Sequence, residues 1–155
     1  MTTPIGDVRV RRPQQHEALL IELRTEAAFA TFRDILLFAA AVGAHVQRRI
    51  AFTNTGEPIR YETLKEPTFS ETLINMIAAN EIADDPEIMD GARTSERVGI
   101  FEEYANGGLE YIQEQVNMRH QSAHLVVIGL VTEALARSGA AEAVSVEELL
   151  SGVSW

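Results

Sequence analysis

The longest apolar run of the chain, FRDILLFAAAVGAHV at residues 32–46, constrains the fold more than any other segment. The run is too long for a strand, and a helix that is apolar on nearly every side must be wrapped by the rest of a small domain. Thr31, three residues before Asp34, resembles a capping box that starts this helix, with Asp in place of Glu. We therefore expect a helix over residues 32–46 at the centre of the core.

Helical spacing of apolar residues also predicts helices on both sides of this run. One helix follows Pro13 and carries Leu19, Leu20, Leu23 and Ala27. A second capping box, Thr68 to Glu71, predicts a helix over 68–83 with Phe69, Leu73, Met76 and Ile77 turned inward. Asp85 and Pro86 are a typical cap and first residue of the next helical segment.

Two further stretches are expected to be helical: residues 94–105 with a next helix that carries Leu109, Ile112 and Val116, and residues 121–137. In the first, Asn106-Gly107-Gly108 is a candidate left-handed end between two helices, although one kinked helix is the alternative. In the second, Leu125, Ile128 and Leu135 are expected to be buried, and Ser138-Gly139 to end the helix. Ser145 would then cap a final short helix, and Trp155 would lie on a tail.

The segment after the central run predicts the one small β-hairpin. Residues 49–52 and 59–61 have strand character, and TNTGEP between them is rich in turn residues. Two strands alone are marginally stable, so the hairpin must pack against helices or a partner. The expected fold is mainly α: a single-domain bundle of five to seven helices over 13–155, with a hairpin at about 49–61, preceded by a basic N-terminal arm over 1–12.

The charge of the chain is unevenly distributed. Its 155 residues carry a net charge of −10; residues 1–65 hold nine Lys or Arg against seven Asp or Glu, whereas residues 66–155 hold four against sixteen. The acidic part repels nucleic acid, and the basic part can tolerate it. Without cysteine, disulfides and thiolate metal sites are excluded. The first residues lack the apolar segment of a secretory signal, so we expect a cytoplasmic protein.

Few residues are arranged for chemistry. His120 and His124 have the i, i+4 spacing of zinc helices, but Gln121 stands where a metalloprotease needs a glutamate base. The carboxylates of Asp84, Asp85, Glu87 and Asp90 fit a helix start better than an EF-hand. Adjacent glutamates such as Glu102 and Glu103 are ordinary on an exposed helix face, and phosphate-binding glycine loops are absent. We expect no enzyme activity, no cofactor and no metal.

Arginines around the expected hairpin and in the arm are the candidate contact residues. Arg48, Arg49 and Arg60 surround the turn, and three more cations precede the first helix. Arginine suits bidentate pairing to carboxylate or phosphate. These side chains would bind a protein partner or grip DNA phosphates without reading bases; alternatively, they pair internally with Glu57, Glu62 and the acidic part. The candidate residues are Arg9, Arg11, Arg12, Arg48, Arg49 and Arg60.

Three stretches also resemble a known family. They are VRVRRPQQHEALL, FRDILLFAAAVGAHVQRRIAF with GEPIRYE, and FSETLINMIAANEIADDPEIM with ERVGIFEEYANGGLEYIQEQV. Together they resemble the DNA phosphorothioation-associated protein 4 family (Dnd system-associated protein 4), over roughly residues 8 to 117. The resemblance implies an accessory protein of a bacterial system that places sulfur in the DNA backbone or restricts DNA by such marks, in anti-phage defence. It implies no catalytic residues.

On this basis the sequence predicts a non-enzymatic adaptor that acts through protein contacts, with proteins of the phosphorothioation system as its partners. The alternative is direct DNA binding through the arginine hairpin and the arm. No membrane contact is expected, and self-association into a homo-oligomer is left open.

Overall fold

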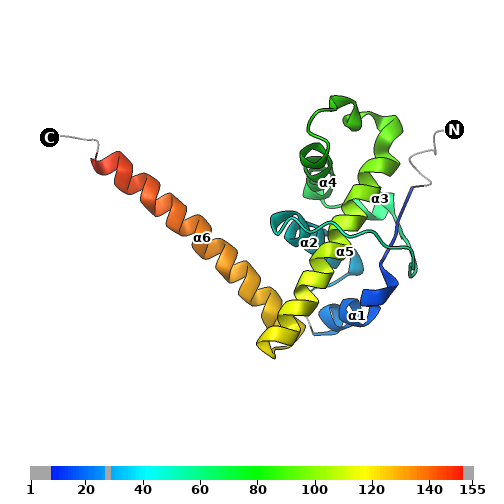
Figure 1. Ribbon diagram of the computed structural model, residues 1–155, viewed down its shortest axis with the longest axis horizontal. Helices are drawn as coiled ribbons and strands as arrows, with labels where there is room; N and C mark the ends of the chain where they lie inside the picture. Colours follow the sequence, from blue (N-terminus) through cyan, green and yellow to red (C-terminus); the bar gives the residue numbers. More distant parts are fainter. Residues whose placement is uncertain (1–7, 27–28, 152–155) are drawn as a thin grey trace.

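A computed structural model describes residues 8–26 and 29–151 of the chain, with side chains described as far as residue 138. Within this part the fold is mainly α, with a small two-stranded antiparallel sheet, as the sequence predicts (Figure 1). Its α-helices are α1 (Glu17–Thr25), α2 (Phe32–His45), α3 (Tyr61–Leu64), α4 (Thr68–Glu81), α5 (Thr94–Arg119) and α6 (Ala123–Ser151). Short 3-10 helices cover Gln14–His16, Pro86–Met89 and Gly91–Arg93.

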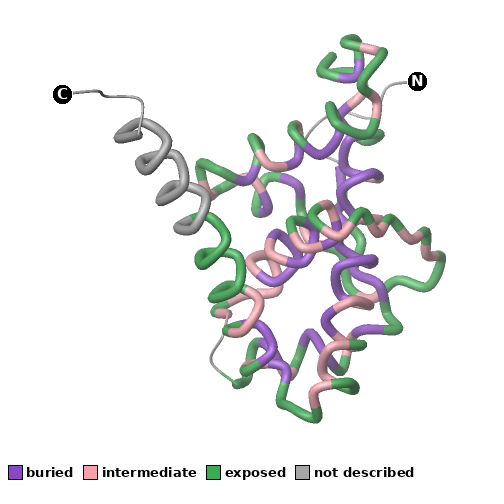
Figure 2. The backbone as a smooth tube through the Cα atoms, turned by 60° about the vertical axis from the view of Figure 1, so that its left-hand side comes forward, coloured by how far each residue is buried: buried purple, intermediate pink, exposed green. Residues whose placement is uncertain are grey.

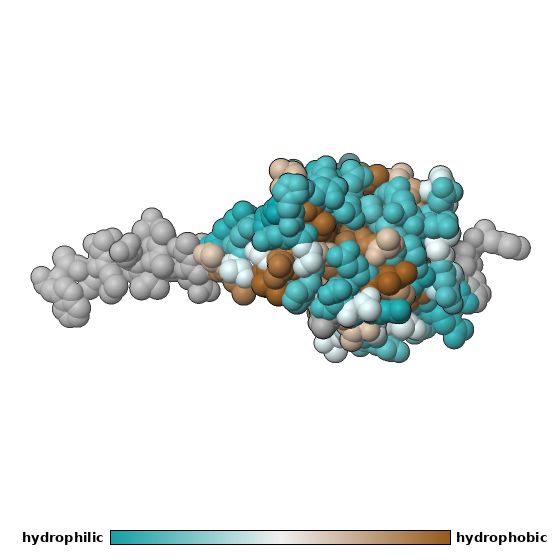
Figure 3. Space-filling model, turned by 90° about the horizontal axis from the view of Figure 1, so that it is seen from below, coloured by the Kyte–Doolittle hydropathy of each residue, from teal (hydrophilic) through white to brown (hydrophobic). Residues whose placement is uncertain are grey.

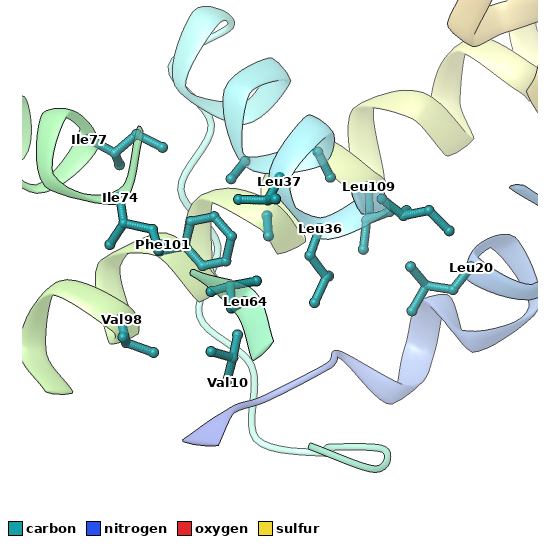
Figure 4. Packing of buried hydrophobic residues seen from close by; sticks show 14 of the residues in the cluster. Val10, Leu20, Leu36, Leu37, Leu64, Ile74, Ile77, Val98, Phe101 and Leu109 are labelled. Carbon is teal, nitrogen blue, oxygen red and sulfur yellow. The ribbon is translucent and has the colours of Figure 1, made fainter. Parts of the chain in front are cut away.

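The apolar helix α2 lies in the core, which confirms the central prediction. The Thr31 hydroxyl caps it by accepting a hydrogen bond from the Asp34 backbone N–H at 3.2 Å. Figure 4 shows Leu36 and Leu37 of this helix among apolar side chains from the other elements. Those neighbours include Val10, Leu20, Leu64, Ile74, Phe101 and Leu109, all of them buried.

Helices α2 and α5 cross in close contact because glycines line the crossing. A Cβ atom added to Gly43 would overlap the Tyr104 carbonyl oxygen, and one added to Gly108 would overlap that of Ala39. Helix α5 runs without a break through Asn106-Gly107-Gly108, so the expected left-handed end is wrong and the one-helix alternative is right. These glycines bring the two backbones together rather than turning the chain.

The sheet does not have the predicted partner strand. Strand β2 (Ile59–Arg60) pairs antiparallel with β1 (Arg9–Val10) from the N-terminal arm, and Arg9 lies opposite Arg60. Residues 49–52 are not a strand, because they run along α5 instead. The Ile50 N–H donates to the Glu103 carbonyl at 3.1 Å, and the Asn106 side-chain amide donates to the Ile50 carbonyl at 3.0 Å. The arm is therefore part of the fold from Val8 onward.

Helix α4 departs from its predicted cap and orientation. Pro67 precedes it, Thr68 is its first residue, and no side chain caps it. Ile74, Ile77 and Ala78 face the core, whereas Phe69 and Met76 are exposed. Residues 69 and 76 lie two turns apart on one face, so a single helix cannot bury them together with Ile74 and Ile77. The prediction that Phe69 and Met76 face inward is wrong.

Helix α6 is longer and more exposed than predicted. It passes through Ser138-Gly139 without ending and includes Ser145, which therefore starts no separate helix. Ala123, Val126 and Val127 are buried at its base, but Leu125, Ile128 and Leu135 are exposed, contrary to expectation. Figure 1 shows α6 extending away from the rest of the molecule, and in Figure 2 the buried residues among those of α6 with a described burial, up to residue 138, lie in its first turns. Trp155 lies outside the described residues.

Candidate interaction surfaces

The arginines of the arm at positions 11 and 12 serve the fold. The Arg11 backbone N–H donates to the Glu102 carboxylate, and its Nε lies 3.1 Å from Glu102 Oε2. Arg12 is buried, with Nη2 at 3.1 Å from Glu17 Oε1 and its guanidinium 4.4 Å from the centre of the Phe32 ring. Both side chains are thus held by this chain's own groups, although the Arg11 side chain remains 43% exposed.

Arg48 and Arg49 follow α2 and pair with the acidic part of the chain. Arg48 Nη1 lies 2.7 Å from Glu114 Oε2 on α5. Arg49 joins two helices, because its Nη1 is 2.7 Å from Glu81 Oε1 on α4 and its Nη2 is 3.2 Å from Glu103 Oε1 on α5. Hydrogen bonds from Tyr104 and then from Arg49 lower the pKa of the Glu81 carboxyl. Internal pairing, the alternative raised from the sequence, describes both arginines.

Arg9 and Arg60 are the remaining members of the predicted set. They lie directly opposite each other on β1 and β2, and both are exposed. Neither forms an ion pair within the residues that the structure describes. Like charges opposite each other in an antiparallel pair are destabilising. The six predicted arginines therefore do not form one surface, and Arg9 and Arg60 are the two that have no ion pair among the described residues.

Glu102 is a buried carboxylate, so the expectation that it lies on an exposed helix face is wrong. Burial raises the pKa of its carboxyl, against the opposing effect of the Arg11 backbone hydrogen bond and charge. Its carboxylate oxygens are taken by Arg11, so it anchors the arm to α5. The sequence feature that could have indicated the burial of Glu102 is its position one residue after Phe101 in an amphipathic helix. That position lies at the edge of the buried stripe.

The two histidines are not one turn apart on a single helix, as their spacing predicted. His120 ends α5 in the left-handed conformation at φ 52°, and His124 belongs to the first turn of α6. No group of three or more His, Asp or Glu side chains in the described residues is arranged to hold a metal ion. The acidic cluster starts a helical segment: Asp85 accepts from the Glu87 N–H at 3.1 Å and pairs with Arg93 at 2.7 Å.

An exposed apolar surface lies on α4. Phe69 and Met76 are 59% and 58% exposed, and Leu73 lies between them, partly buried against the core. We call these three residues the α4 face. Methionine is common on surfaces that bind protein partners because its side chain adapts to irregular shapes.

A second apolar surface lies where α6 leaves the body. Ile128, Val131 and Leu135 are 48%, 41% and 68% exposed and recur at i, i+3 and i+7; we call them the α6 stripe. The stripe borders a groove of about 340 Å³. Figure 3 shows apolar side chains gathered at the base of the projecting helix. The groove is lined by Phe38, Ala41 and Val42 from α2 and by Val131, Ala134 and Leu135 from α6.

None of the helices in the described part of the chain is long and apolar enough to cross a bilayer. Among known protein families, the family described as DNA sulphur modification system-associated protein 4 matches residues 9–148. The match includes most of α6, beyond the resemblance recognised in the sequence up to residue 117. No curated protein and no solved structure matches the chain.

Proposed function

Because the chain belongs to the family of DNA sulphur modification system-associated protein 4, we propose that it is a non-enzymatic accessory protein of such a system and acts in the cytoplasm by binding other proteins of the system. Association with a DNA sulphur modification system follows from the family. What we propose beyond the family is that the chain is an adaptor, which serves either the modification of DNA or its restriction. The observation that carries it is the α4 face, where a large aromatic and a methionine side chain remain exposed.

Exposure of Phe69 and Met76 is costly unless a partner covers them. Burying a side chain of this size is worth about 1.5–3 kcal/mol relative to leaving it in water. The two lie on one face of a regular helix whose opposite face is fixed in the core through Ile74 and Ile77. Such a face presents a preformed apolar surface to a partner with little loss of conformational entropy.

The glutamates also support a role without chemistry. Glu102 is held by Arg11, Glu103 and Glu81 by Arg49, and Glu114 by Arg48. A general acid or base must be within hydrogen-bond reach of a substrate proton. These carboxylates are already paired with arginines, so they stabilise the packing of the arm and of the segment after α2 against the helices.

Co-purification tests the proposal. The tagged chain is expressed with the neighbouring genes of its DNA sulphur modification system, and captured proteins are identified by mass spectrometry. We expect the variant that combines Phe69→Ser and Met76→Ser to fold, as judged by circular dichroism, and to lose the captured system protein. Met118→Ser, which alters a 73%-exposed methionine at the end of α5, is the matched control and should retain it. Capture that is equal for all three proteins would refute the role of the α4 face.

Direct DNA binding is the second candidate, and the exposed Arg9–Arg60 pair favours it. Two cations neutralise at most two phosphates, so the slope of log affinity against log salt would be about −2. The net charge of −10 opposes even this contact. We therefore expect weak binding to duplex DNA at physiological salt, lost when both residues are changed to glutamate. Tight binding at that salt, abolished by Arg9→Glu with Arg60→Glu, would make DNA contact the primary function.

A further inference from the structure

The α6 stripe and its groove are a second apolar surface, which the contact with a system protein through α4 does not use. We propose that two copies of this chain associate through their α6 helices, packed antiparallel about a two-fold axis that crosses each helix near residue 140. The projecting half of each helix then covers the groove between α2 and α6 of the other copy. This self-association goes beyond the proposed function and does not depend on which protein binds α4.

The spacing of the stripe suits a second helix. Ile128, Val131 and Leu135 repeat at i, i+3 and i+7, the seam along which two helices pack. A two-fold interface uses the same patch of both copies, so each chain must supply both the groove and the helix that covers the groove of the other copy. Here the groove lies at the base of α6. The later part of the same helix can cover the groove of another copy.

The length of the projecting part matches that task. The groove is formed along α6 by residues 130–137, about 12 Å of helix at 1.5 Å per residue. Residues 138–151 extend about 21 Å beyond the groove. If the two-fold axis crosses the helix near residue 140, these residues lie along the groove of the other copy. An isolated helix of this length is marginal in water, and packing against a second copy would stabilise it.

The charges are complementary. The rim of the groove carries His45 and Arg137, whose Nη1 lies 3.5 Å from His45 Nε2. Glu133, also on the rim, is already paired with Arg119 at 3.2 Å. By sequence, residues 138–151 hold three glutamates and no Lys, Arg or His. Near the proposed axis the sequence reads SGAAEA, and such small residues let two helix backbones approach closely.

The mass of the purified chain in solution tests the association. Light scattering coupled to size exclusion should give about twice the 17.1 kDa of one chain at micromolar concentration. Val131→Glu with Leu135→Glu should give the single-chain mass with an unchanged circular dichroism spectrum. Leu125→Glu is the matched control: it changes another exposed leucine of α6 that lines no part of the groove, and its mass should remain doubled.

Cross-linking tests the antiparallel register. The chain has no cysteine, so single cysteines report cleanly. Ala140→Cys should give a disulfide-linked dimer on mild oxidation, because residues at the axis meet their own copies. Val131→Cys should not, because two residues 131 would be about 27 Å apart along the helices.

Three results would overturn the proposal. A doubled mass that survives the Val131→Glu and Leu135→Glu changes would place the interface elsewhere. Cross-linking of Val131→Cys would mean a parallel pair. A single-chain mass at every concentration, with stripe variants that lose the captured system protein, would assign the stripe to that protein instead of a second copy.

Discussion

At the scale of single residues, the glycines at the α2–α5 crossing allow the two backbones to approach closely because they have no side chain. A Cβ at Gly108 would overlap the Ala39 carbonyl oxygen, a backbone atom that cannot move aside. We expect Gly108→Ala to lower the free energy of unfolding by about 3 kcal/mol or more, since overpacking forces the helices apart. Gly99→Ala, in the same helix with no atom near its added methyl, should gain up to about 1 kcal/mol. Urea denaturation measures both, and equal effects would contradict the close crossing.

Gln47 carries a backbone strain that glycine would remove. It follows α2 at φ 56°, and the hydrogen bonds Arg48 N–H to Gly43 O at 2.8 Å and Gln47 N–H to Ala44 O at 3.2 Å form a Schellman end. Non-glycine residues in this conformation cost about 1 kcal/mol. Gln47→Gly should therefore raise the melting temperature, while Gln113→Gly inside α5 should lower it. A lower melting temperature for Gln47→Gly would show that the left-handed end is not formed.

Glu102 should make stability depend on pH. Burial raises the pKa of its carboxyl above the ordinary value of 4.5, so the native state holds the proton more tightly than the unfolded chain. The stability gained from the proton is present below pH 4.5 and is lost as the pH rises through the raised pKa. Glu102→Gln does not titrate, so its free energy of unfolding relative to wild type should increase from pH 4 to pH 7, measured by urea denaturation. A difference independent of pH would contradict the raised pKa.

At the scale of elements, α2 was predictable because composition alone decides its place. A run of apolar residues capped by Thr31 has few polar side chains to turn toward solvent, so most of it is expected in the core. Leu37 is buried, whereas Phe38 is partly exposed and lines the groove beside α6. Leu37→Ala should therefore cost about 2–5 kcal/mol of unfolding free energy, and Phe38→Ala clearly less, by urea denaturation of the dilute protein. A larger loss at Phe38 would mean that this residue belongs to the core.

Other elements could not be predicted because non-local contacts decide them. The strand partner of Ile59–Arg60 is Arg9–Val10, far earlier in the chain, and no local pattern favours it over residues 49–52. Those residues instead bind α5 through the hydrogen bond from Asn106 to Ile50, and Gly107 leaves space for the backbone of the preceding Arg48. The sequence of α4 is apolar on more than one side, so helical spacing did not distinguish Ile74 and Ile77 from Phe69 and Met76.

At the scale of the whole molecule, the sequence indicated the family and the uneven charge but not where the contact surfaces lie. The sequence raised internal pairing of Arg48 and Arg49 only as an alternative and could not name their partners. Those partners, Glu81, Glu103 and Glu114, are 32 to 66 residues away. The apolar α4 face was hidden among residues assigned to the core. Surface and core can be separated here only when tertiary packing is known.

Hydrogen exchange tests the central claim, that α4 is the surface through which this chain binds its DNA sulphur modification system. Amide exchange is compared for the chain alone and in complex with the captured system protein. We predict added protection over residues 67–82, and none there when duplex DNA is added instead. Protection confined to residues 8–12 and 59–61, produced by DNA alone, would contradict the account.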